Sequence, residues 1–79
     1  MKARITVTLK NGVLDPQGRA IANALHSLGF DNVEDVRAGK LIEVQLKAAD
    51  EASARGEIDA MCRQLLTNPV IENYRVELL

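Results

Sequence analysis

Few side chains in this sequence belong to the types that do chemistry. The 79 residues include one histidine, His26, and one cysteine, Cys62. A general base needs a hydrogen-bonded partner and a defined pocket, and no such constellation accompanies His26. A reactive thiolate needs an electropositive, partly exposed setting, whereas Cys62 falls on the apolar stripe of a predicted helix. We therefore expect a solvated His26 near a helix end, a buried and unreactive Cys62, and no catalytic residue.

One loop has the composition of an anion site. The segment from Asn11 to Gly18 carries two glycines at the start of a predicted helix, where free N–H groups attract anions. It lacks the Lys-Ser/Thr pair of a phosphate-binding loop, and Asp15 would repel phosphate. Asp15 is instead a good N-cap, with Pro16 at the first helical position. A single cysteine excludes a multi-cysteine metal site, so we expect neither a cofactor nor a metal on this chain.

Charge and hydropathy exclude two classes of partner. Ten Lys and Arg against eleven Asp and Glu leave a net charge of -1, without the basic excess that nucleic-acid binding requires. No apolar run approaches the roughly 18 residues needed to cross a bilayer. The first residues alternate charged and apolar types, unlike a signal peptide. We therefore expect a cytoplasmic protein that binds neither nucleic acid nor membrane.

The apolar pattern predicts alternating strands and helices. Alternation near the N-terminus predicts a strand, and apolar residues at helical spacing predict two amphipathic helices, the first ended by Gly29 and the second capped by Asp50. Between the helices we expect two short strands joined by a hairpin at Gly39-Lys40, with Gly39 at positive φ. The predicted elements are a strand over 2–10, a helix over 16–28, strands over 35–38 and 42–47, a helix from 51 to the Asn68-Pro69 stop, and a strand over 74–78.

This order predicts an α+β fold. The plan β-α-β-β-α-β gives an antiparallel sheet with two helices on one face, the ferredoxin-like arrangement, in a single domain over residues 1–79. The other face carries both signs of charge, which suits a solvated surface or a polar interface. A chain this short buries only about 60–65% of its unfolded surface. Since no disulfide or metal is available to stabilise it, we expect an oligomer.

Three blocks of this sequence resemble the PurS family. They are NGVLDPQGRAI at 11–21, LGF followed by VRAGKLIEVQL between 28 and 46, and LLTNPVIENYRVEL at 65–78. The resemblance spans nearly the whole chain, with the blocks in the expected order.

The resemblance implies a non-catalytic role in purine biosynthesis. PurS is the small subunit of phosphoribosylformylglycinamidine synthase, which converts formylglycinamide ribonucleotide, glutamine and ATP to formylglycinamidine ribonucleotide. A glutaminase subunit makes ammonia, and a large synthetase subunit uses ATP and Mg. Members of the family form homodimers or dimers of dimers and bring the two larger subunits together. Help with ammonia transfer is a further hypothesis.

We chose interface residues by their position within the resembling blocks. Turn, cap, hairpin and helix-stop roles compete with each choice, and they already account for Gly39 and Pro69. The predicted interface residues are Asn11, Asp15, Gln17, Arg37, Lys40, Asn73 and Tyr74.

The alternative to a synthase subunit is an amino-acid-binding regulatory module. Such modules share the β-α-β-β-α-β plan, dimerise, and bind ligand near a strand-to-helix loop, a place that Asn11-Gly12 would fill. The Asp15-Pro16 cap and the absence of an attached catalytic domain count against it.

Overall fold

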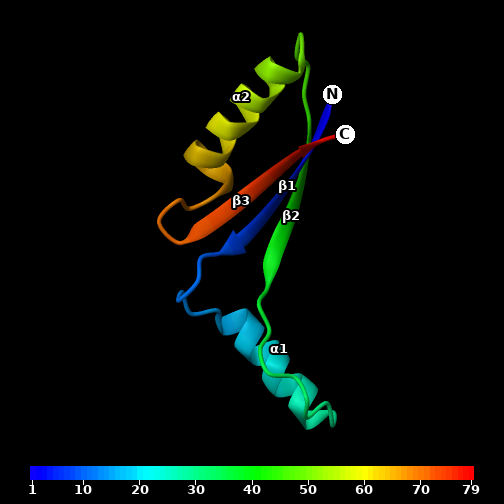
Figure 1. Cartoon of the computed structure of the whole chain (residues 1–79), viewed down its shortest axis with the longest axis vertical. Helices are drawn as coiled ribbons and strands as arrows, with labels where there is room; N and C mark the ends of the chain where they lie inside the picture. Colours follow the sequence, from blue (N-terminus) through cyan, green and yellow to red (C-terminus); the bar gives the residue numbers. More distant parts are fainter.

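The computed structural model describes residues 1–79 and contains a three-stranded antiparallel sheet and two α-helices. The strand order is β2-β1-β3, with the N-terminal strand in the centre. Neither helix has the length and apolar character of a membrane span. The elements, seen in Figure 1, are β1 (Lys2–Leu9), α1 (Pro16–Ser27), β2 (Gly39–Gln45), α2 (Glu51–Met61), a π-helical turn η1 (Cys62–Leu66) and β3 (Glu72–Leu78).

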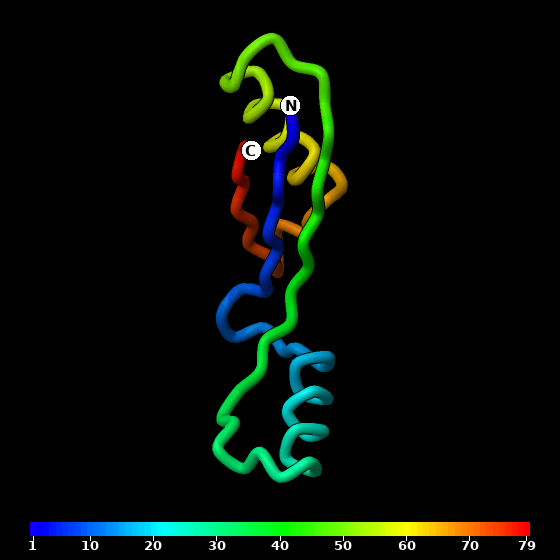
Figure 2. Tube along the Cα trace, turned by 90° about the vertical axis from the view of Figure 1, so that its right-hand side faces the viewer, coloured from blue at the N-terminus to red at the C-terminus, as the bar shows by residue number.

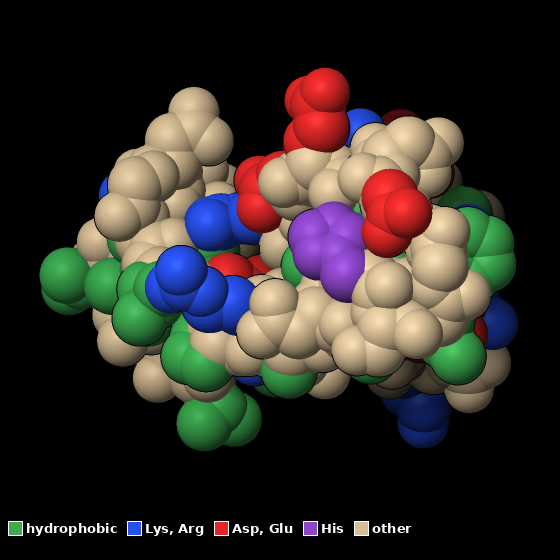
Figure 3. All heavy atoms as spheres, turned by 90° about the horizontal axis from the view of Figure 1, so that it is seen from below, with side chains coloured by type: hydrophobic (Ala, Val, Ile, Leu, Met, Phe, Trp, Pro, Cys, Tyr) green, Lys and Arg blue, Asp and Glu red, His purple; other side chains and the backbone are tan.

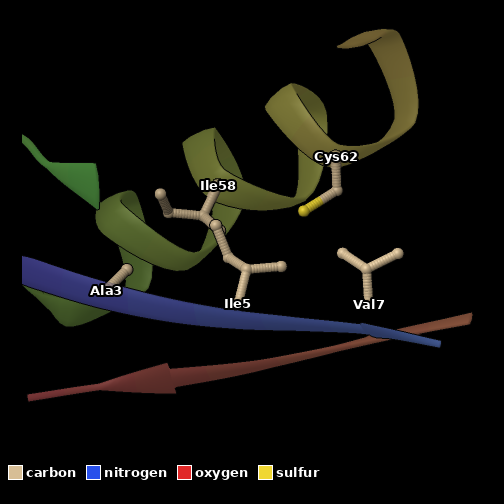
Figure 4. Packing of buried hydrophobic residues seen from close by; sticks show 5 residues of the cluster. All are labelled: Ala3, Ile5, Val7, Ile58 and Cys62. Carbon is tan, nitrogen blue, oxygen red and sulfur yellow. The ribbon is translucent and has the colours of Figure 1, made fainter. Parts of the chain in front are cut away.

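The core lies between β1 and α2. Ala3, Ile5 and Val7 alternate along β1 and point toward Ile58 and Cys62 of the helix (Figure 4). All five side chains are buried, and each large one contributes about 1.5–3 kcal/mol through burial. Burial raises the pKa of the Cys62 thiol, and the nearby Asp59 carboxylate raises it further. The predicted alternation of the first strand and the predicted burial of Cys62 are confirmed.

Helix α1 lies beyond the end of the sheet. Figures 1 and 2 show it below the strands, beside the segment that leads into β2. The molecule measures 51 × 24 × 15 Å with a radius of gyration of 16.1 Å, whereas a compact chain of this length would have about 12 Å. The α+β class and the antiparallel sheet are confirmed. The expectation of two helices on one face is wrong for a single chain, because only α2 covers the sheet.

The predicted hairpin at Gly39-Lys40 is also wrong. Residues 33–38 form no strand, and the order is β-α-β-α-β. Val36 and Ala38 are half-buried between exposed neighbours because this segment runs along α1. The two pass so closely that a Cβ on Gly18 would collide with the Val36 carbonyl oxygen. Positive φ occurs only at Gly12 and Gly29. Gly39 instead allows a close approach between strands, because a Cβ there would lie 2.6 Å from the Val7 carbonyl oxygen.

Both predicted N-caps are confirmed. One carboxylate oxygen of Asp15 accepts a 2.8 Å hydrogen bond from the Gly18 N–H, and Asp50 accepts an equivalent 2.8 Å bond from the Ser53 N–H. At the other end of α1, Gly29 has a φ of 97°, as its place after the helix predicts.

Candidate functional site

The three blocks that carry the resemblance meet at one end of the sheet. Because β2 and β3 both run antiparallel to β1, they begin where β1 ends, and Val7 pairs with Lys40 on one side and Tyr74 on the other. We call the junction between this end of the sheet and α1 the waist, formed by residues 10–15 and 36–40. A shallow hollow of about 190 Å³ there is lined by residues that include Asp15, Gln17 and Lys40.

Asp15 connects the two segments of the waist. Its second carboxylate oxygen accepts a 2.7 Å hydrogen bond from the Ala38 N–H, while the first caps α1. The side chain is only 7% exposed. The N–H groups of Gly18 and Ala38 hold the pKa of this carboxyl below its usual value, and the positive charge of Arg37 lowers it further. The Gly18 N–H is therefore already occupied, which leaves this helix N-terminus a poor site for a ligand anion.

Arg37 also connects these two segments, but here the side chain extends from residues 36–40 to the backbone of residues 10–15. Its guanidinium donates a 2.8 Å hydrogen bond to the Val13 carbonyl oxygen and a 3.1 Å bond to the Lys10 carbonyl oxygen. The planar fork of donors suits two acceptors at once, which a lysine ammonium would match poorly. Together, Asp15 and Arg37 fix the direction in which α1 leaves the sheet.

The other predicted interface residues fall into two groups. Asn11, Gln17, Lys40 and Asn73 are exposed around this end of the sheet. Tyr74 is half-buried against the core, and its hydroxyl donates a 3.4 Å hydrogen bond to Asp59. Burial raises the pKa of Tyr74, and the Asp59 charge adds to the effect. The first group is therefore free to contact a partner, whereas Tyr74 mainly supports the core.

The open face of the sheet is polar and mixed in charge, as expected. Glu43 on β2 forms ion pairs of 3.4 Å with both Lys2 and Arg4 on β1, and the Lys2 charge is the main reason that the pKa of Glu43 is lowered. Exposed pairs of this kind contribute little to stability. Four charged residues of the predicted strands over 2–10, 35–38 and 42–47 lie outside the observed strands: Lys10, Asp35, Arg37 and Lys47.

His26 lies on the surface of α1, as predicted. Figure 3, seen from the α1 end, shows the imidazole at the surface beside acidic side chains. Its Nε2 lies 2.8 Å from the Val33 carbonyl oxygen, so the ring ties the helix to the segment that follows it. The adjoining hollow of about 520 Å³ is lined by charged side chains that include Arg19, Glu34 and Asp35, with no Ser, Thr or Cys hydroxyl or thiol. No group of three or more His, Cys, Asp and Glu side chains is placed to hold a metal ion.

Comparison with known proteins identifies the family. The family model PurS, described as phosphoribosylformylglycinamidine (FGAM) synthase, matches residues 2–79. The chain belongs to the PurS family. The resemblance expected from the three sequence blocks is thus confirmed, as is the link to FGAM synthase.

Relatives and solved structures agree with this assignment. The FGAM synthase subunit PurS of Synechocystis sp. is 55% identical over 95% of this chain and 75% of its own length. The structure of Bacillus subtilis PurS is 45% identical and covers 96% of this chain and 94% of its own, with a TM-score of 0.86. A Thermotoga maritima structure described as PurLQS matches at 33% identity and a TM-score of 0.88, covering 99% of this chain and 95% of that one.

Proposed function

We propose that this chain is the small, non-catalytic subunit of FGAM synthase, the ligase that uses glutamine and ATP to convert formylglycinamide ribonucleotide to formylglycinamidine ribonucleotide. The observation that carries the proposal is the family match over residues 2–79. The likeness to a chain of the Thermotoga maritima PurLQS structure supports a place in a complex with other subunits. A role in purine biosynthesis also fits the cytoplasmic compartment expected from the sequence.

In this role the chain brings a glutaminase and a synthetase subunit together. Its cysteine is buried, and its histidine contacts a backbone carbonyl, so neither is placed as a nucleophile or a general base. ATP and Mg would be used on the synthetase, with no cofactor held by this chain. Holding two active sites in one assembly raises their effective concentration for each other. It also shortens the path of ammonia, which loses its nucleophilic lone pair when bulk water protonates it.

We further propose that residues 1–79 act as one domain that self-associates, as a homodimer or a dimer of dimers. The chain exposes 5691 Å², whereas a compact chain of this mass exposes about 4,700 Å². The excess of about 1,000 Å² is similar to the roughly 800 Å² that each partner buries in a stable interface. Only 9 of the 79 residues are buried, which is a small core for an isolated chain.

The exposed residues of the waist are our proposed contact with the larger subunits. Lys40 is exposed there and has no ion pair, and Arg37 is exposed beside it. We expect the double variant Arg37→Ala/Lys40→Ala to weaken assembly with the glutaminase and synthetase subunits, measured as the fraction of this chain that co-elutes with them on a sizing column. Lys47→Ala, which removes an exposed lysine beyond the opposite end of β2, is the matched control.

Two outcomes would count against these assignments. Unchanged co-elution of the double variant would remove Arg37 and Lys40 from the interface. Failure of the wild-type chain to co-elute with either subunit, at concentrations where they bind other PurS chains, would overturn the proposed function itself.

A further inference from the structure

The polar side of helix α1 borders the hollow of about 520 Å³, which we call the α1 hollow. Arg19, Asn23 and His26 lie at helical spacing, so they share one face of the helix, and all three line this hollow. Glu34 and Asp35 line it from the segment that leads into β2. Figure 3 shows acidic side chains next to the imidazole and basic ones to its left. The α1 hollow is therefore a polar cavity of a size that holds a small ligand.

The α1 hollow contains charges that have no partner within the chain. Arg19 forms no ion pair, although carboxylates line the same cavity. Glu34 and Asp35 form none either, and one carboxylate oxygen of Asp35 accepts a 2.9 Å hydrogen bond from the Val36 N–H beside it. Opposite charges that border one cavity without pairing can both be satisfied by a ligand that carries one charge at each end.

The balance of charge in the α1 hollow disfavours an anionic ligand. Asp15, Glu34 and Asp35 contribute three negative charges to the lining, whereas Arg19 and Arg37 contribute two positive ones. A net negative lining repels a phosphate. The Arg37 guanidinium is already bound to two backbone carbonyl oxygens, which leaves Arg19 as the unengaged cation. Because a simple amine would leave Arg19 unmatched, the lining favours a zwitterion.

We propose that the α1 hollow binds a free α-amino acid with an uncharged polar side chain. The ligand carboxylate pairs with Arg19, and the ligand ammonium pairs with Glu34 and Asp35. The Asn23 amide and the second ring nitrogen of His26 are the groups left to bind the ligand side chain. A ligand held in this way joins α1 to the segment that leads into β2. The site adds a ligand to the proposed subunit role and does not depend on that role.

The first test titrates the full chain with L-glutamine. Nitrogen–proton correlation NMR should show saturable shifts of backbone amides confined to residues 12–26 and 33–37, with a dissociation constant of about 1 mM, as a ligand of roughly ten heavy atoms reaches. N-acetyl-L-glutamine lacks the ammonium and L-glutaminamide lacks the carboxylate, so each should bind about fivefold more weakly. Inorganic phosphate should leave these amides unshifted.

The second test removes one charge at a time. Arg19→Gln and Glu34→Gln should each weaken the binding of L-glutamine about fivefold. The matched controls are Arg63→Gln and Glu57→Gln, which change exposed residues of α2 and η1 that form no ion pair and do not line the hollow, and they should keep the wild-type affinity. All four side chains are exposed, and circular dichroism checks that the helices are retained.

Four results would overturn the amino-acid site. They are unshifted amides with both L-glutamine and L-asparagine, wild-type affinity in Arg19→Gln or Glu34→Gln, equal binding of either glutamine derivative, and saturable shifts of the same amides by phosphate. None of these results alters co-elution with the glutaminase and synthetase subunits, so the failure of this site and the failure of the proposed function are separate outcomes.

Discussion

Replacing Ile58 by alanine is expected to lower the free energy of unfolding by about 3 kcal/mol. Ile58 is fully buried in the core cluster and lies over Ile5 (Figure 4), and truncation of a buried isoleucine leaves a cavity in addition to losing apolar burial. A chain of this length has only about 4–12 kcal/mol of stability in total, so the loss is a large share of it. Thermal unfolding followed by circular dichroism should show a decrease in Tm of about 15 °C.

The control for this variant is Leu65→Ala. Leu65 lies in η1, within two turns of Ile58, but it is 82% exposed, and substitutions at such positions usually change stability by less than about 0.5 kcal/mol. Both variants should be measured at one protein concentration, because self-association stabilises the folded chain by mass action. Equal destabilisation by the two variants would contradict the placement of the core between β1 and α2.

Asp15→Ala should lower Tm by about twice as much as Asp50→Ala. Both residues are N-caps that accept one 2.8 Å hydrogen bond from a backbone N–H of their own helix. Asp15 also accepts a 2.7 Å bond from the N–H of Ala38, a residue outside its own helix. The alanine variant therefore loses a cap and leaves the Ala38 N–H unpaired in the waist. Thermal unfolding of the two variants provides the comparison, and equal losses would mean that the bond to Ala38 contributes nothing.

The contribution of Asp15 should also depend on pH. Because the pKa of this carboxyl is lowered in the folded chain, folding favours the charged form. Its contribution is complete above the ordinary value of 3.8 and is lost as the pH falls below that value through the folded pKa. The difference in stability between wild type and Asp15→Ala should therefore be constant near pH 7 and shrink below about pH 4. If the difference in stability between the two proteins grew as the pH fell, the pKa of Asp15 would be raised by folding and not lowered.

Local signals in the sequence predicted much of the fold. The alternation in β1, the caps at Asp15 and Asp50 and the end of α1 before Gly29 depend on contacts within a few residues, and each was confirmed. The hairpin prediction was wrong because alternating burial also arises when an extended segment runs along a helix, as Val36 and Ala38 do. The position of α1 could not be predicted, since an apolar stripe shows that a face is covered but not which element covers it.

The interface residues chosen from the sequence lie near one another, and their contact with a partner stays a prediction. Antiparallel pairing brings the three resembling blocks to one end of the sheet, so residues chosen from separate blocks are neighbours there. The hydrogen bonds from the Ala38 N–H to Asp15 and from Arg37 to the Val13 carbonyl oxygen were not foreseen. Their partners are backbone N–H and carbonyl groups, which every residue type carries and which therefore leave no signal in the sequence.

The most direct test of the docking role compares two nitrogen sources. The glutaminase and synthetase subunits are assayed for formylglycinamidine ribonucleotide formation with glutamine or with ammonium, with and without this chain. We expect that omitting the chain lowers glutamine-dependent turnover at least about tenfold and leaves ammonia-dependent turnover nearly unchanged. Equal loss of both activities would contradict a role in coupling the two sites, and turnover by the purified chain alone would contradict the claim that it holds other proteins in place without reacting itself.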